Sequence, residues 1–179
     1  MILPIQTYGK DVLRQQAKPI DSQDEAIHQF VEDMFESMYA AEGIGLAAPQ
    51  VDRSIRVFIV DISPMDETES RRVFLNPRIL EFGPEKDNYE EGCLSLPTIH
   101  ESVTRPTSVR ISYETLDGEK RDEWIDGFLA RVIQHEYDHL EGVLFIDHLS
   151  GLKRSLLRKT LNKIASGEIE VESSENYQL

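Results

Sequence analysis

The chain has 179 residues, 40% of them hydrophobic and 29% charged, which is the balance of a soluble globular protein of about one domain. Its formal net charge of −14 argues against broad, nonspecific nucleic-acid binding, because an acidic surface repels phosphates. The one cysteine, Cys93, excludes a disulfide framework and fits a reducing compartment. No run reaches the roughly 20 apolar residues that span a bilayer, and the first residues do not form a secretory signal. We therefore expect a cytoplasmic protein with neither a membrane nor DNA as partner.

The first predicted element is a helix over residues 22–41. Ser22 and Glu25 form a capping box at its start, Gly43 is expected to terminate it, and apolar residues recur between them at helical spacing. A loop rich in small residues follows. The sequence then predicts strands over 55–60, 72–75, 108–114 and 119–125, an exposed loop over 64–71 and a hairpin turn at Asp117-Gly118.

Two more helices are predicted in the last third of the chain. One begins after the N-cap Asp126 and ends near Gly142, and the other covers residues 150–165. The polar tail, 166–179, is expected to be flexible. These elements predict an α+β fold in which antiparallel strands surround one central helix, flanked by an N-terminal and a C-terminal helix.

The central helix carries the sequence His135-Glu136-Tyr137-Asp138-His139. Residues four apart share a helix face, so both imidazoles can point at one metal ion. Glu136 stands beside the first histidine and can reach a bound water without being a ligand itself. By itself, the motif also fits two solvated histidines on an acidic helix.

A third ligand separates these interpretations, and the sequence offers several. An extended zinc-protease motif would have a histidine where this chain has Phe145. Glu168 and Glu170 lie far downstream, and His148 lies beyond the end of the helix. Cys93 follows Gly92 in a short segment of strand character, where a buried inert thiol is the alternative interpretation. One cysteine and two histidines would leave a tetrahedral position open, which is the geometry of a catalytic site.

Three segments together resemble the signature motifs of the peptide deformylase family, in the family's order. They are Gly43-Ile44-Gly45-Leu46-Ala47-Ala48-Pro49-Gln50, Glu91-Gly92-Cys93-Leu94-Ser95 and His135-Glu136-Tyr137-Asp138-His139. The resemblance extends from the N-terminus to about residue 165. It implies one catalytic domain over 1–165, and the helical ending resembles the first type of the family.

The resemblance implies a hydrolase that removes the formyl group from N-formylmethionine of new polypeptides and releases formate. Cys93, His135 and His139 would hold one ferrous ion, for which zinc, nickel or cobalt can substitute. Glu136 would transfer protons. The side-chain amide of Gln50 and the backbone N–H of Leu94 would stabilise the oxyanion. The alternative function is that of a zinc peptidase or another metal amidase.

The same resemblance implies a substrate site. The main chain of Gly43, Ile44 and Gly45 would pair with the peptide as an added strand. Tyr89, Phe128 and Val132 would line an apolar methionine slot, although plain core packing also explains each of them. Two arginines are expected nearby: Arg131, where relatives commonly have an aliphatic residue, at the rim of the slot, and Arg105 in an ion pair with Glu91.

The C-terminal helix, 150–165, is basic. It carries Lys153, Arg154, Arg158, Lys159 and Lys163 and no acid. An apolar stripe of Leu152, Leu156, Leu157 and Ile164 is expected to leave these cations on the other face. Two interpretations stay open: a solvated face of a core-packed helix, or a surface that docks on the ribosome near emerging nascent chains.

Overall fold

The computed structural model describes residues 1–171, so most of the predicted flexible tail, 166–179, lies outside the described residues. The elements are α1 (Glu25–Ala40), β1 (Gly45–Ala47), β2 (Val57–Val60), β3 (Arg72–Phe82), β4 (Lys86–Cys93), β5 (Leu96–Pro106), β6 (Ser108–Glu114), β7 (Lys120–Asp126), α2 (Gly127–Leu140) and α3 (Gly151–Ala165), with short 3-10 helices η1 (Asp11–Arg14), η2 (Ala48–Val51) and η3 (Phe145–His148).

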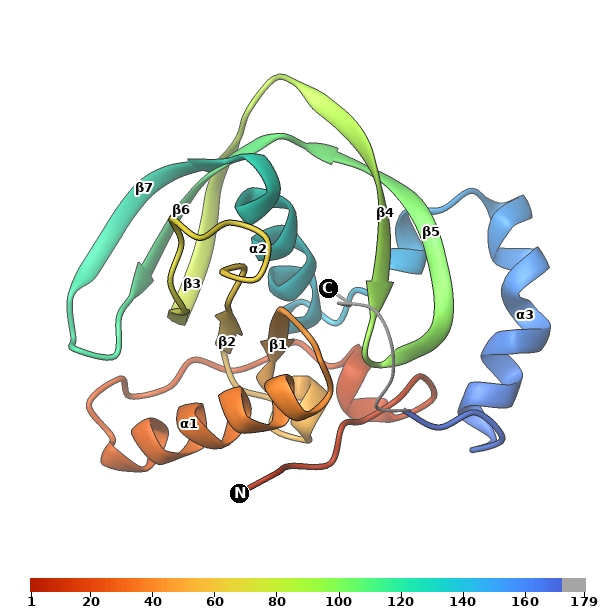
Figure 1. The fold of residues 1–179 in the computed structure, drawn as a ribbon, viewed down its shortest axis with the longest axis horizontal. Coiled ribbons are helices and arrows are strands. Elements are labelled where there is room, and N and C mark those ends of the chain that lie inside the picture. The colour runs from red at the N-terminus through yellow and green to blue at the C-terminus, as the bar shows by residue number, and fades with distance from the viewer. Residues whose placement is uncertain (172–179) are drawn as a thin grey trace.

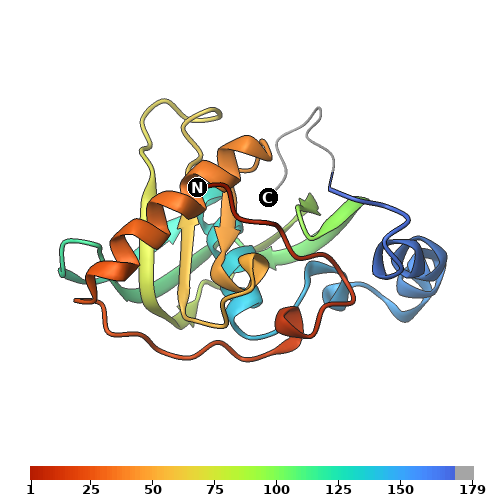
Figure 2. The same ribbon diagram turned by 90° about the horizontal axis from the view of Figure 1, so that it is seen from below.

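The strands form two antiparallel sheets on either side of α2 (Figure 1). One sheet has the order β1-β2-β3-β6-β7, and the other is the hairpin β4-β5. Figure 2 shows the same molecule from below, with α1 and α3 at opposite ends. The predicted α+β architecture around one central helix is confirmed.

Helix α2 is central because it is apolar on several sides. Val132 and Ile133 are fully buried and share one core with Phe58 of β2 and Ile111 of β6. A second core lies under β5 and includes Cys93 itself together with the two buried residues of α3, Leu161 and Ile164. Burial of these side chains holds α2 rigidly between the sheets, which fixes the residues that it carries.

Helix α1 departs from the prediction at both ends. Its N-cap is Asp24, whose side chain accepts a hydrogen bond from the Ala26 N–H, so the predicted capping box at Ser22 is wrong. Asp is as good a cap as Ser and stands directly before the helix. At the other end Glu42, with φ of 57°, takes the left-handed conformation, and the Gly43 N–H then bonds the Met38 carbonyl.

The strands were predicted unevenly. The range of β6 and the Asp117-Gly118 hairpin are confirmed, and Gly118 has the positive φ of 84° that the turn requires. However, β3 runs to Phe82 instead of ending at residue 75, and the sequence did not predict the long β5. The second half of β3 and most of β4 are exposed. In β5 buried and exposed residues do alternate, but Arg105 occupies one of the buried positions, so none of the three strands shows the regular apolar alternation that marks a half-buried strand.

Helix α3 begins as predicted, because the Ser150 hydroxyl accepts a hydrogen bond from the Lys153 N–H. The predicted apolar stripe is wrong for two of its four residues: Leu152 and Leu156 are 73% and 75% exposed, whereas Ile164 is buried and Leu157 packs partly buried against the same core. The packed face therefore consists of Leu157, Leu161 and Ile164, since the helix touches the hairpin mainly through its second half. No helix within residues 1–171 is long and apolar enough to cross a membrane.

Candidate metal centre

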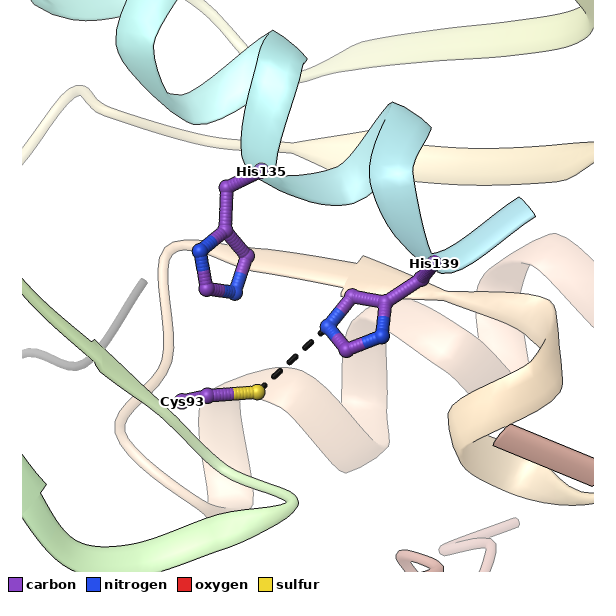
Figure 3. A group of neighbouring side chains, drawn as sticks. All are labelled: Cys93, His135 and His139. Carbon is purple, nitrogen blue, oxygen red and sulfur yellow. Dashed lines mark hydrogen bonds between the residues drawn. The ribbon is translucent and has the colours of Figure 1, made fainter. Parts of the chain in front are cut away.

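Cys93, His135 and His139 converge on one point (Figure 3). The cysteine ends β4, and the two histidines project from one face of α2. One ligand atom from each side chain lies within 4.8 Å of the others, and all three residues are buried. The Cys93 Sγ and the His139 Nε2 are 3.4 Å apart. The structure thus brings together the three donors that the sequence singled out.

The chemistry of this group fits a cation. His135 Nε2, His139 Nδ1 and both carboxylate oxygens of Glu136 are buried without a hydrogen-bond partner among the described residues. Each such group costs about 1–3 kcal/mol when nothing replaces its water. A soft thiolate and two imidazoles are the donors that ferrous iron and zinc accept.

Burial shifts the pKa of three ionisable groups at this centre toward their neutral forms. Burial, and next the charge of Glu136, raises the pKa of the Cys93 thiol. Burial and the nearby Glu91 raise the pKa of Glu136 well above its ordinary value. Burial and the nearby His135 lower the pKa of His139 well below its ordinary value. A divalent cation would reverse the penalty on the thiolate and would favour the neutral imidazole that serves as a ligand.

The other ligand candidates lie elsewhere. Phe145, which stands where the extended zinc-protease motif has its histidine, offers no donor and stacks on the His135 ring with centroids 5.9 Å apart. His148 bonds Asp138 at 2.8 Å. Glu168 and Glu170 are exposed beyond α3. Within residues 1–171, Cys93 is therefore the third donor that accompanies the two histidines.

Gln50 lies against this centre and is fully buried in η2. Its side-chain oxygen accepts a hydrogen bond from the Ala47 N–H at 2.9 Å. Its side-chain nitrogen consequently faces the centre, 3.6 Å from the Cys93 sulfur and 3.1 Å from the Ser95 hydroxyl. Leu94 occupies the turn that joins β4 to β5, directly after the cysteine.

Gly45 has a role that the sequence did not reveal. A Cβ at this position would lie 2.5 Å from the Glu136 Oε1, too close for any real contact. Strand β1 therefore approaches α2 closely only because residue 45 has no side chain. The glycine makes room for the carboxylate, whether or not a peptide also pairs with its backbone. Gly43 is tight as well, since a Cβ there would lie 2.8 Å from a methyl group of Leu94.

The residues of the expected methionine slot lie together. Ile44 and Val132 belong to one apolar cluster, and Phe128 packs against its edge. Tyr89 of β4 meets Phe128 with ring centroids 5.4 Å apart, and Tyr89 is 46% exposed. An aromatic pair at the surface thus borders an apolar interior.

Behind the centre, Glu91 accepts a hydrogen bond from the Nδ1–H of His135 at 2.9 Å, which leaves Nε2 as the free ring nitrogen. The expected pair of Arg105 and Glu91 is present and buried. Burial alone would raise the pKa of Glu91, but hydrogen bonds from His135 and Arg105 hold it far below its ordinary value. The expected place of Arg131 is wrong: it is 4% exposed and also binds Glu91, because the buried carboxylate attracts a second cation.

A buried Cys-His-His donor set beside an unpaired glutamate, on an α+β scaffold, is the site of a mononuclear metallohydrolase. The comparison with known proteins makes the class specific. The family model of polypeptide deformylases matches residues 2–155. The chain belongs to the peptide deformylase family, whose enzymes are metal-dependent hydrolases that remove the formyl group from nascent polypeptides.

Individual relatives agree over nearly the whole chain. The peptide deformylase of Salinibacter ruber is 42% identical over 96% of this chain and 93% of its own. That of Cytophaga hutchinsonii is 46% identical over 95% of this chain and 94% of its own. Among solved structures, the peptide deformylase of Plasmodium falciparum superposes with a TM-score of 0.85 at 36% identity, over 91% of this chain and 95% of that one.

Proposed function

We propose that this chain removes the formyl group from N-formylmethionine of new polypeptides with one ferrous ion held by Cys93, His135 and His139. Zinc, nickel or cobalt would substitute, since the same donors suit all of them. The metal would lower the pKa of a bound water, so that a nucleophile is available near neutral pH. The observation that carries the proposal is the buried, unpartnered carboxylate of Glu136 beside three converging donors.

Glu136 is assigned the proton transfers. Its two oxygens have no partner within the described residues, so they are free to accept a proton from the attacking water. The same group would then return that proton to the departing amine, as general acid–base catalysis requires. Because the backbone of β1 approaches the carboxylate closely at Gly45, the position of the carboxylate is set by packing instead of by hydrogen bonds.

We assign the stabilisation of the oxyanion, which forms during attack on the formyl carbonyl, to Gln50 and Leu94. The Ala47 N–H holds the amide of Gln50 in one orientation, with its nitrogen toward the centre. A donor fixed in advance stabilises developing charge without reorganisation. The backbone N–H of Leu94, one residue beyond the cysteine, is the second proposed donor.

The formylated peptide is proposed to lie along Gly43, Ile44 and Gly45, with its methionine side chain toward Phe128 and Val132. Tyr89 would close the slot from the opposite sheet, as its contact with Phe128 suggests. We assign catalysis to one domain over 1–165. A cytoplasmic location follows from this proposed substrate.

The ribosome is proposed as a further partner through α3. Leu152 and Leu156 are exposed beside the cations of this helix, so the outward face is both basic and apolar. Such a face offers counterion release on RNA together with hydrophobic contact. Co-sedimentation with bacterial ribosomes at low and high salt tests it, with a Lys153→Glu/Arg158→Glu variant as comparison; equal binding of both proteins would refute it.

The residue assignments are tested by two variants. Cys93→Ala should lose stoichiometric metal in anaerobically purified protein. Glu136→Gln should keep the metal and lose about 10²–10⁴-fold in formate release from formyl-Met peptides, the usual scale for a general acid–base. Near-native turnover of Glu136→Gln would contradict the mechanism. Comparable rates on acetyl-Met and formyl-Met peptides would instead indicate a general metal amidase.

A further inference from the structure

Arg131 is a buried cation outside the reacting groups. Its Nη1 donates to the Glu91 Oε2 at 2.8 Å and to the Val103 carbonyl at 2.8 Å. Its Nη2 donates to the carbonyl and the carboxylate of Asp87, at 3.0 Å and 2.6 Å. One guanidinium on α2 therefore holds two points of β4 and one of β5.

The contact between Arg131 and Glu91, here called the inner arm, leads through the Glu91 carboxylate to the proposed metal ligand His135. Glu91 meets His135 Nδ1 and Arg105 Nη2 through Oε1, and Arg105 Nε and Arg131 Nη1 through Oε2. Arg105 is shared with Asp138, to which it donates at 2.8 Å. Arg131 is thus a second, independent restraint on the oxygen pair that orients the His135 ring.

The contact between Arg131 and Asp87, here called the outer arm, lies beside the proposed methionine slot. Residues 87, 89 and 91 alternate onto one face of β4. The guanidinium carbon of Arg131 lies 5.9 Å from the Tyr89 ring, between its two anchors on that strand. Tyr89 in turn packs on Phe128, one turn before Arg131 on α2. The segment of β4 that leads to Cys93 is therefore clamped to α2 directly beside the slot.

We propose that Arg131 is a positioning residue that sets both the orientation of His135, through Glu91, and the wall of the methionine slot, through Asp87. Its planar fork makes both contacts at once, which a lysine ammonium cannot do. Partners of metal-ligating histidines typically contribute about 10–100-fold to metal affinity or activity. The inference rests on the proposed role of His135 as a ligand.

The test uses purified full-length protein and metal itself as the probe. Arg131→Met should weaken Zn²⁺ and Co²⁺ binding about 10–100-fold in chelator competition and shift the Co²⁺ absorption spectrum, because the His135 ring loses a restraint. Arg110→Met is the matched control, since it removes an arginine with two ion pairs on the surface of β6. Its metal affinity should equal that of the wild type.

Two further variants separate the arms. Asp87→Asn should leave metal affinity unchanged and raise the KM for formyl-Met peptides without lowering kcat, as expected when only substrate binding is lost. Arg131→Lys should follow Asp87→Asn, because its ammonium can still face Glu91 but not span to Asp87. This variant also serves if Arg131→Met does not fold.

The inference is overturned if folded Arg131→Met keeps wild-type metal affinity and cobalt spectrum, or if Arg131→Lys loses metal affinity at unchanged KM. Equal weakening of metal binding in Asp87→Asn and Arg131→Met would also overturn it, since the two arms would then be one general structural effect. If Cys93→Ala loses metal while Arg131→Met does not, the proposed function stands and only this inference fails.

Discussion

Replacing Gly45 with alanine puts a methyl group where the carboxylate of Glu136 lies. The new Cβ would be 2.5 Å from Oε1 and 3.0 Å from the carboxyl carbon, whereas ordinary contacts begin at 3.4 Å. Glu136 is fully buried, so the carboxylate cannot swing out into bulk solvent. Either it rotates away or β1 separates from α2, and both changes alter the distance between the proposed base and its water.

The size of the effect follows from that overlap. Restoring ordinary contact requires a displacement of about 1 Å, and a misplacement of this size costs about 10²-fold in rate, or about 2.7 kcal/mol in the barrier. Overpacking also destabilises a core by about 1–3 kcal/mol, so the melting temperature should fall by about 2–4 °C for each kcal/mol. Metal content should be retained, because the three atoms nearest to the new methyl group all belong to Glu136 and to none of the three donors.

The assay is formate release from a formyl-Met peptide, together with metal analysis and thermal unfolding. Gly151→Ala is the matched control: a Cβ there meets nothing within 4 Å, and it should change neither turnover nor metal content. Wild-type kcat in Gly45→Ala would refute the argument that packing against Gly45 sets the position of Glu136. Loss of metal from that variant would refute it as well.

Other predictions follow from the same contacts. Gln50→Ala should keep its metal and lose about 10²–10³-fold in kcat, the scale of a lost oxyanion donor; undiminished kcat would exclude that role. The pKa of Glu91 is lowered from its ordinary value of 4.5, so its carboxylate stabilises the fold above that pH. The stability gap between wild type and Glu91→Gln in denaturant unfolding should therefore narrow as pH falls below 4.5, and a constant gap would contradict the linkage. Leu161→Ala should cost about 2–5 kcal/mol of unfolding free energy and the exposed Leu156→Ala about 0.5 kcal/mol or less, a contrast that equal losses would contradict.

The sequence alone predicted the features that depend on local spacing. His135 and His139 share a helix face whatever surrounds that helix, and Asp117-Gly118 makes a hairpin turn by its own conformational preference. The motifs around Gln50 and Cys93 were specific enough to indicate the family, and hence the donors that the structure brings within 4.8 Å of one another.

Tertiary structure decided what depends on neighbours far away in the chain. The composition of α3 did not reveal that Leu156 faces solvent, because which side of a helix is covered depends on the surface beneath it. The charge of Arg131 suggested that its side chain lies at the rim of the slot. It is buried instead, because it forms an ion pair with the carboxylate of Glu91, forty residues away in β4. The sequence suggested that Gly45 serves to let the peptide substrate approach its backbone. Only the close packing of β1 against α2 shows that the missing side chain also makes room for Glu136. A local pattern specifies which way a residue can point, whereas the packing of the chain determines what it meets there.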